Sequence, residues 1–126
     1  MREIKFKYGY SDGIITFEKA FTLEEKEQGL QLEEISDSPL LKNYKIVYKR
    51  QYTGLKDKNG VEIYEGDIVR ANIISWTLDT MGEIVWDNKH SCYCNKNEGG
   101  LTQLQRLNNF EVIGNIYEDS HLLDNN

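Results

Sequence analysis

The segment with the most potential for chemistry is His90-Ser91-Cys92-Tyr93-Cys94. In an extended strand, residues 90, 92 and 94 share one face, so an imidazole and two thiolates could approach a soft metal such as zinc. A structural zinc site uses four protein ligands, and His121 is the only other His or Cys in the chain. The alternative is that both cysteines are small, half-buried side chains on an irregular strand. The missing fourth ligand favours this alternative, so we expect no metal and no cofactor.

No other pattern of residues predicts catalysis. The chain lacks the glycine-rich phosphate-binding loop, the dinucleotide fingerprint and the His-Glu-x-x-His zinc motif. Acidic pairs such as Glu24-Glu25 and Glu33-Glu34 are sequence neighbours, whose carboxylates point in different directions on a helix or a strand. Such pairs are typical of a solvated surface. We therefore expect that the protein is not an enzyme, and we identify no small-molecule substrate.

A basic segment, residues 42–58, offers a binding surface instead. It holds six Lys and Arg side chains against one Asp, a net charge of +5, with Tyr44, Tyr48 and Tyr52 among them. Cations along a phosphate backbone and rings that stack on bases are typical of surfaces that bind single-stranded nucleic acid. Strand alternation, however, places Lys45 and Lys49 opposite the tyrosines, which favours core tyrosines and an ordinary solvated face. The candidate partner surface comprises Lys49, Arg50, Lys56, Lys58 and Arg70.

Length and composition predict one globular domain. The chain has 126 residues, of which 39% are hydrophobic and 29% are charged, and its formal net charge is −6. This balance argues against a surface built as a whole to attract phosphate. No apolar run approaches the roughly 20 residues that a membrane-spanning helix needs, so we expect no membrane partner. With two cysteines and no secretory signal pattern at the N-terminus, we expect a cytoplasmic protein.

The acidic residues are concentrated ahead of the basic segment. Residues 18–37 carry a net charge of −5, opposite in sign to residues 42–58. The two segments could neutralise each other within one molecule or between copies, and exposed edge strands also favour self-association. We therefore expect a homo-oligomer.

The acidic segment also contains a pattern typical of a helix start. Thr22 and Glu25 have the spacing of a capping box, and Gly29 suits a helix end. A helix of about two turns is marginal without packing, and a solvated loop fits this composition equally well. Both interpretations remain open at this point.

Alternation of apolar and polar residues predicts a series of short strands. They cover residues 1–8, 14–17, 44–50, 67–74, 83–86, 101–107 and 110–117, and residues 88–100 are expected to form an exposed loop. Turns are expected at Ser11-Asp12-Gly13, Asn59-Gly60, Glu65-Gly66 and Asn108-Asn109. The predicted core comprises Ile4, Phe6, Ile46, Tyr48, Val69, Ile73, Ile84, Trp86, Phe110, Val112 and Ile116. Many short strands with frequent turns favour a small, strongly bent sheet or barrel.

Three separated motifs resemble one known family. The longest covers residues 51–69 and includes Asp57-Lys58-Asn59-Gly60 and Glu65-Gly66-Asp67. The second motif is formed by the opening residues 1–6, and the third by residues 111–118 followed by Leu122-Leu123. On these residues, which occur in the same order, the chain resembles the YopX family of small proteins encoded mainly by bacteriophages and prophages. Residues 18–37 and 90–100 do not match what is typical of that family.

The resemblance implies a mainly β fold, that is, a β-rich α+β fold. It places an SH3-like small barrel in the C-terminal half, with an N-terminal β-hairpin and short helix packed on it. We divide this single domain, residues 1–126, into an N-terminal subregion 1–43, a barrel-like core 44–118 and a tail 119–126.

The resemblance also implies a phage-related cytoplasmic protein of the bacterial host cell, with no established activity and no catalytic residues. We therefore expect a phage accessory protein that acts by binding or self-assembly. The alternative is a nucleic-acid-binding SH3-like module that uses residues 42–58.

Overall fold

The fold is mainly β, as predicted, and forms two compact units. The computed structural model describes residues 3–29, 44–74 and 78–124. The units comprise residues 1–52 and 53–126. The boundary lies inside strand β3 (Lys45–Lys56), whereas the division made from the sequence lies between residues 43 and 44.

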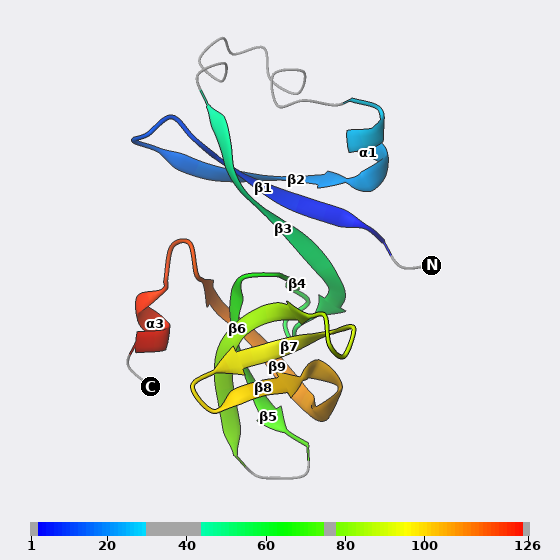
Figure 1. The fold of residues 1–126 in the computed structure, drawn as a ribbon, viewed down its shortest axis with the longest axis vertical. Helices are drawn as coiled ribbons and strands as arrows, with labels where there is room; N and C mark the ends of the chain where they lie inside the picture. The colour runs from blue at the N-terminus through cyan, green and yellow to red at the C-terminus, as the bar shows by residue number, and fades with distance from the viewer. Residues whose placement is uncertain (1–2, 30–43, 75–77, 125–126) are drawn as a thin grey trace. The chain divides into compact units, whose positions relative to one another are not determined.

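The first unit contains an antiparallel sheet with the strand order β2-β1-β3 (Figure 1). Strands β1 (Lys5–Ser11) and β2 (Thr16–Thr22) form the predicted hairpin. Its turn is closed by Asp12, whose Oδ1 accepts hydrogen bonds from the N–H groups of Ile14 at 2.9 Å and Ile15 at 2.8 Å. Gly13 has the positive φ that the turn requires.

A short helix follows this hairpin, so the helical interpretation of the capping pattern is confirmed. Helix α1 (Leu23–Glu27) starts at Thr22, whose Oγ1 accepts from the N–H of Glu25 at 3.1 Å. The Glu25 carboxylate accepts in return from the N–H of Thr22 at 2.8 Å. Residues 18–22, at the start of the acidic segment, belong to β2 instead, and residues 30–37 lie outside the described residues.

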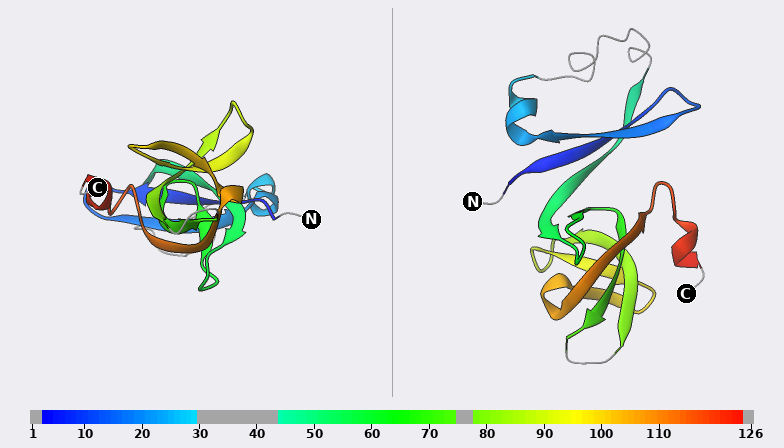
Figure 2. Two further views of the ribbon diagram at one scale, coloured as in Figure 1. Left: turned by 90° about the horizontal axis from the view of Figure 1, so that it is seen from below. Right: turned by 180° about the vertical axis from the view of Figure 1, so that it is seen from behind.

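The second unit holds a five-stranded antiparallel sheet with the order β8-β7-β6-β5-β9. The strands and helices of the second unit are β4 (Glu62–Tyr64), β5 (Asp67–Ile73), β6 (Asp79–Asp87), β7 (Cys92–Asn97), β8 (Gly100–Gln103), the 3-10 helix η2 (Leu104–Arg106), β9 (Leu107–Asn115) and α3 (His121–Asp124). Strand β6 bends strongly along its length (Figure 1, Figure 2). The more specific expectation of an SH3-like barrel stays a prediction. No helix in the described ranges is long and apolar enough to cross a membrane.

The core of this unit lies between the bent strands and η2. It contains Ile63, Val69, Ala71, Ile84, Tyr93, Leu104 and Leu107. Three partly buried side chains of the predicted core, Ile73, Phe110 and Val112, pack against it. These contacts join residues from β4, β5, β6, β7 and β9, so the core stabilises the pairing order of β7, β6, β5 and β9.

Three predictions of secondary structure are wrong. The strand predicted over residues 101–107 ends at Gln103, because η2 (Leu104–Arg106) separates β8 from β9. Residues 88–100 were expected to form a loop, but they contain β7 and the first residue of β8. The polar residue Asn95 is fully buried in β7, where its Nδ2 donates to the carbonyl oxygen of Val69 at 3.0 Å. Residues 108–109 do not separate two strands, because β9 continues through them with Asn109 at a φ of 58°.

Three residues of the predicted core are exposed. Ile4 precedes the first strand, and Ile46 lies near the start of β3, where it pairs with Tyr10 of β1 and its side chain remains exposed. Trp86, near the end of β6, is 43% exposed. By contrast, Val69 and Ile84 are fully buried, as predicted.

The turn between β3 and β4 is held by the buried carboxylate of Asp57. Its Oδ1 accepts from the N–H groups of Asn59 at 2.8 Å and Val61 at 2.9 Å. Its Oδ2 accepts from the N–H of Val112 in β9 at 3.0 Å. Burial raises the pKa of Asp57, but these three N–H groups outweigh burial and hold it below its usual value. One side chain therefore closes a turn and fixes a distant strand to it.

The rest of the motif at residues 51–69 has similar structural roles. The Thr53 hydroxyl donates to the carbonyl oxygen of Ile63 at 2.8 Å, and the Asp67 carboxylate accepts from the N–H of Tyr64 at 2.8 Å. Gly66 has a φ of 84°, and its N–H donates to the carbonyl oxygen of Ile84 at 2.9 Å. The motif thus specifies the frame of the second unit.

Replacement of Asp57 tests this interpretation. In Asp57→Asn, an amide NH₂ group replaces one of the two accepting oxygens, so a buried N–H loses its partner. We therefore expect the free energy of unfolding at neutral pH to fall by about 1–3 kcal/mol. Because the lowered pKa stabilises the fold above the unfolded-state value near 4, the difference from wild type should shrink as pH falls through the folded-state pKa. Urea unfolding from neutral to acidic pH measures both effects.

The exposed variant Glu118→Gln serves as the matched control, and its stability should follow that of wild type across this range. A constant stability difference between Asp57→Asn and wild type at all pH values would contradict the role assigned to the charge.

Candidate binding groove

The predicted basic residues are divided between the two units: Lys49 and Arg50 belong to the first, and Lys56, Lys58 and Arg70 belong to the second. Lys49, Lys56, Lys58 and Arg70 are exposed. Within the second unit, Lys58 Nζ lies 3.4 Å and Arg70 Nη1 lies 3.9 Å from the carboxylate of Glu111. Two of the four exposed cations therefore flank the same carboxylate, which reduces the positive charge that they offer to a phosphate.

Arg50, the fifth residue, has a different role, and its assignment to an exposed surface is wrong. It is 1% exposed, and its Nη2 lies 3.0 Å from Oε2 of Glu18 on β2. Its Nε also donates to Oε2 at 3.1 Å, and the Tyr48 hydroxyl donates to that oxygen at 2.7 Å. Gly9 makes room for this arrangement, because a Cβ there would lie 2.3 Å from the Tyr48 ring. Arg50 therefore stabilises the first unit.

The net charge is also distributed unevenly between the units. Residues 1–52 contain nine acidic and nine basic side chains, whereas residues 53–126 contain twelve acidic and six basic ones. The second unit thus carries the whole net charge of −6. Because Lys56, Lys58 and Arg70 all belong to this unit, the field around them opposes a polyanion.

The residues of the His90-Cys92-Cys94 pattern do not form a metal-binding group. His90 Nδ1 lies 2.6 Å from Oδ2 of Asp87, and the Sγ atoms of Cys92 and Cys94 lie 3.9 Å apart. Burial, together with the Cys92 thiol, raises the pKa of Cys94 to about 11, which disfavours the thiolate that a metal would need. Within the described ranges, no three His, Cys, Asp or Glu side chains are placed to hold a metal ion.

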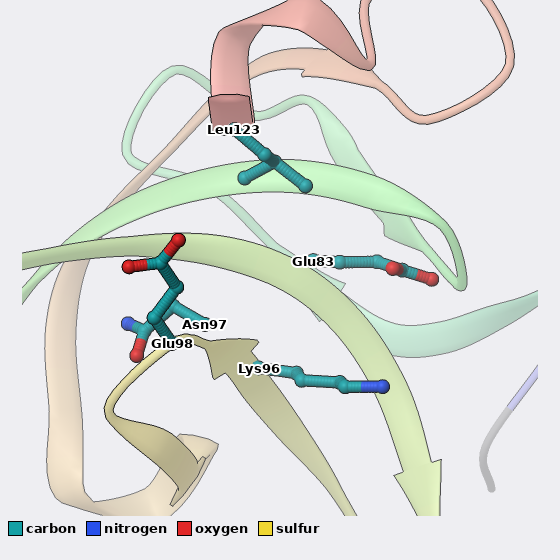
Figure 3. Close-up of a pocket in the computed structure, with 5 residues that line it drawn as sticks. All are labelled: Glu83, Lys96, Asn97, Glu98 and Leu123. Atoms are coloured by element: carbon teal, nitrogen blue, oxygen red, sulfur yellow. The ribbon is translucent and has the colours of Figure 1, made fainter. Parts of the chain in front are cut away.

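The second unit contains two neighbouring hollows. One, of about 360 Å³, is lined by Glu83, Lys96, Asn97, Glu98 and Leu123 (Figure 3). The other, of about 340 Å³, is lined by Val85, Trp86, Asp87, Lys96, Asn97, Gly100 and Leu101. Because both share Lys96 and Asn97, we treat them as one site and call it the outer groove.

The outer groove combines apolar side chains with acidic ones. Trp86 and Leu101 are 43% and 52% exposed, and the Trp86 ring packs edge-on against the Tyr93 ring at 4.9 Å between centroids. Glu83 and Lys96 are register partners on β6 and β7, and Figure 3 shows their side chains extending in the same direction. Burial raises the pKa of Glu83, and the Lys96 ammonium opposes that rise. A hydrogen bond from His90 lowers the pKa of Asp87.

The outer groove is not predicted by the sequence pattern. Trp86 was assigned to the core, and residues 96–98 were assigned to a loop. A signal was present in the alternation of Glu83, Val85 and Asp87, which are side chains of one strand face. The pairing of β7 with β6, which brings Lys96 beside Glu83, depends on contacts that this local pattern does not encode.

A charge deletion tests the position of Arg50. Arg50→Ala leaves the Glu18 carboxylate partly buried without its cation, so we expect a loss of about 3 kcal/mol or more in the free energy of unfolding. The neighbouring exposed variant Lys49→Ala loses a cation–π contact with the Phe6 ring, 5.0 Å from Nζ to the centroid, and should change it by no more than about 1 kcal/mol. Chemical denaturation measures both values.

If Arg50→Ala does not fold, the double variant Arg50→Met with Glu18→Gln supplies the comparison. It removes both charges and should recover part of the loss. Equal, small effects of Arg50→Ala and Lys49→Ala would contradict the buried ion pair.

A known protein family matches a range of the chain that includes the motifs on which the frame depends. The family model described as YopX protein matches residues 5–124, which include both units almost completely. A search of curated proteins finds no match. Because the family match covers nearly the whole chain, this protein belongs to the YopX family.

Proposed function

We propose that this protein acts by binding a protein partner or further copies of itself, and not by catalysis. It would serve as an accessory protein of a phage or prophage in the cytoplasm of the bacterial host. The biological setting rests on the resemblance to a family encoded mainly by phages and prophages. The observation that carries the binding proposal is the outer groove, which Leu101 of β8 and Trp86 of β6 both line as exposed residues, with β7 between their strands.

An exposed hollow of this kind is typical of protein interfaces. Tryptophan is enriched at the centres of such interfaces, where a large ring buries much apolar area with little loss of conformational freedom. Trp86 is already oriented by its contact with Tyr93. A partner that covers Trp86 would therefore gain apolar burial without first ordering the ring.

The buried charged groups support the fold. The carboxylates of Asp57 and Asp67 accept hydrogen bonds from backbone N–H groups, and Arg50 pairs with Glu18. These bonds stabilise the charged forms of the groups in structural positions, which is not how a general acid or base is prepared.

Self-assembly is supported by the ends of the two sheets. Strand β2 ends one sheet and β8 ends the other, and no strand of the described residues pairs with their outer edges. On β3, Ile46 and Val47 are adjacent and exposed. Open edges and exposed apolar side chains on strands promote pairing between copies. A homo-oligomer is therefore the form that we propose.

Light scattering after size-exclusion chromatography tests self-assembly. We expect a molar mass that is a multiple of the chain mass and that rises with concentration. Val47→Lys should lower it, since it places a charge beside the exposed Ile46 on β3 and opposes apolar contact between copies. Ile14→Lys, at an exposed turn, should not lower it. A monomer at every concentration, at low and high salt, would contradict self-assembly.

Titration with single- and double-stranded DNA and RNA tests the competing nucleic-acid hypothesis. We expect no salt-dependent binding, because Arg50 is buried and the second unit is acidic. Nucleic-acid binding that weakens with salt and is lost in Lys49→Ala or Lys56→Ala would contradict the proposed protein partner and support the nucleic-acid hypothesis.

A further inference from the structure

We infer that Cys92 and Cys94 form a reversible redox pair: a peroxide joins them in a disulfide within one chain, and a small thiol such as glutathione separates them again. This modification site goes beyond the proposed function and does not depend on it. The two residues are the only cysteines of the chain, so no other thiol of the same molecule competes for either of them.

The position of the two thiols on β7 brings them together. Side chains two residues apart on a strand share one face, and the Sγ atoms of Cys92 and Cys94 lie 3.9 Å apart. Two residues along a strand place the Cα atoms about 6.4–6.8 Å apart. Disulfides bridge Cα atoms that are about 4.4–6.8 Å apart. The two sulfur atoms can therefore bond, but only near the limit of disulfide geometry.

A disulfide in this position is reversible because it is strained. Departures from ideal geometry store energy in the bond and make it easier to reduce. The ring that it closes holds only Cys92, Tyr93 and Cys94, so it restricts the unfolded chain less than a disulfide across a long loop would. Strained disulfides have the higher reduction potentials that are typical of labile and regulatory pairs. The state of this pair therefore follows the balance between peroxide and thiol.

The different exposure of the two thiols sets the order of the reaction. Cys92 is half-buried, whereas Cys94 is 1% exposed. Burial, together with the Cys92 thiol, raises the pKa of Cys94 to about 11, so Cys94 is a neutral thiol at neutral pH. An oxidant from solvent therefore meets Cys92 first, and Cys94 is the resolving thiol beside it.

The reaction has two steps. The Cys92 sulfur attacks one oxygen of hydrogen peroxide, the O–O bond breaks, and Cys92 becomes a sulfenic acid while hydroxide takes the thiol proton and leaves as water. The Cys94 sulfur then attacks the Cys92 sulfur, the S–S bond forms, the S–O bond breaks, and hydroxide leaves with the Cys94 proton as a second water. Two molecules of glutathione reverse the change by thiol–disulfide exchange and become glutathione disulfide.

Oxidation should displace Tyr93, which lies between the two cysteines. Its ring belongs to the core of the second unit and packs edge-on against Trp86 at 4.9 Å between centroids. Drawing the two sulfur atoms from 3.9 Å to bonding distance tightens the pleat of β7 at this residue. Both cysteines also pair with β6 residues that line one hollow of the outer groove. The oxidised pair therefore alters a core contact and the strand next to the groove.

Intact-mass measurement on the full-length protein tests the pair. The protein is treated with hydrogen peroxide, the excess is removed with catalase, and free thiols are blocked with iodoacetamide after unfolding. We expect a single-chain product that is lighter than the reduced protein by two hydrogen atoms and takes up no iodoacetamide. Incubation with reduced glutathione before blocking should restore both free thiols.

Single-cysteine variants separate the two roles. Cys94→Ser keeps the accessible thiol without its resolving partner, so peroxide with glutathione should convert it to a mixed glutathione disulfide at least about tenfold more than wild type. Cys92→Ser keeps only the buried thiol, which iodoacetamide should alkylate in the folded protein at least about tenfold more slowly than the thiol of Cys94→Ser. Circular dichroism establishes that each variant is folded, and Cys94→Ala replaces Cys94→Ser if the buried hydroxyl prevents folding.

Tryptophan fluorescence reports whether β7 responds to oxidation. In Trp76→Phe, Trp86 is the single tryptophan of the chain. Its emission should shift to longer wavelength on oxidation and return with glutathione, because the indole loses its contact with Tyr93. The matched control adds Cys92→Ser to this variant, and its emission should not respond.

Three results would overturn the inference. The first is peroxide-treated wild type that gains oxygen or forms covalent dimers instead of losing two hydrogen atoms. The second is an equal amount of mixed glutathione disulfide in wild type and Cys94→Ser, since Cys94 would then not resolve Cys92. The third is a disulfide that leaves the Trp86 emission unchanged, which would contradict the displacement of Tyr93. None of these measurements depends on a binding partner, so failure of the redox pair is distinguishable from failure of the proposed function.

Discussion

The buried carboxylate of Asp57 is the constraint on which the second unit depends. A charge so poorly exposed to water is stable only where hydrogen-bond donors surround it, and three backbone N–H groups meet this need. Two of them belong to the turn that Asp57 begins, and the third belongs to Val112 in β9. The turn and β9 are therefore fixed together, and β9 in turn pairs with β5, on which β6, β7 and β8 are built. This frame therefore fixes the positions of the strands that line the outer groove.

In the first unit, an ion pair stabilises a buried charge. Glu18 on β2 accepts hydrogen bonds from Arg50 and Tyr48 on β3, across the position in β1 that Gly9 occupies. The close approach of the Tyr48 ring requires a residue without a side chain there. The cost of burying Arg50 is offset because its guanidinium and the carboxylate satisfy each other in several hydrogen bonds. As a consequence, counting basic residues along the sequence overstates the positive charge that the surface of this unit presents.

Local chemistry explains which parts of the fold were predictable. The Asp12 turn, the Thr22 and Glu25 capping box and the tight turn at Gly66 each depend on residues within a few positions of one another. The burial of Asn95 could not be predicted in this way, since its Nδ2 donates to the carbonyl oxygen of Val69, 26 residues earlier in the chain. The same limit applies to Arg50, whose partner Glu18 lies 32 residues away. Only the groove residues on β6 showed a local pattern, and their neighbours on β7 are determined by strand pairing.

The frame and the groove therefore depend on different parts of the sequence. The bonds of Asp57, Thr53 and Asp67 lie in the motif at residues 51–69. The groove takes Lys96, Asn97 and Glu98 from β7 and the residue that follows it. These residues are held at the surface by a sheet whose stability comes from elsewhere, so their side chains can change without loss of the core. The structure thus separates the residues that specify the fold from those that line the groove.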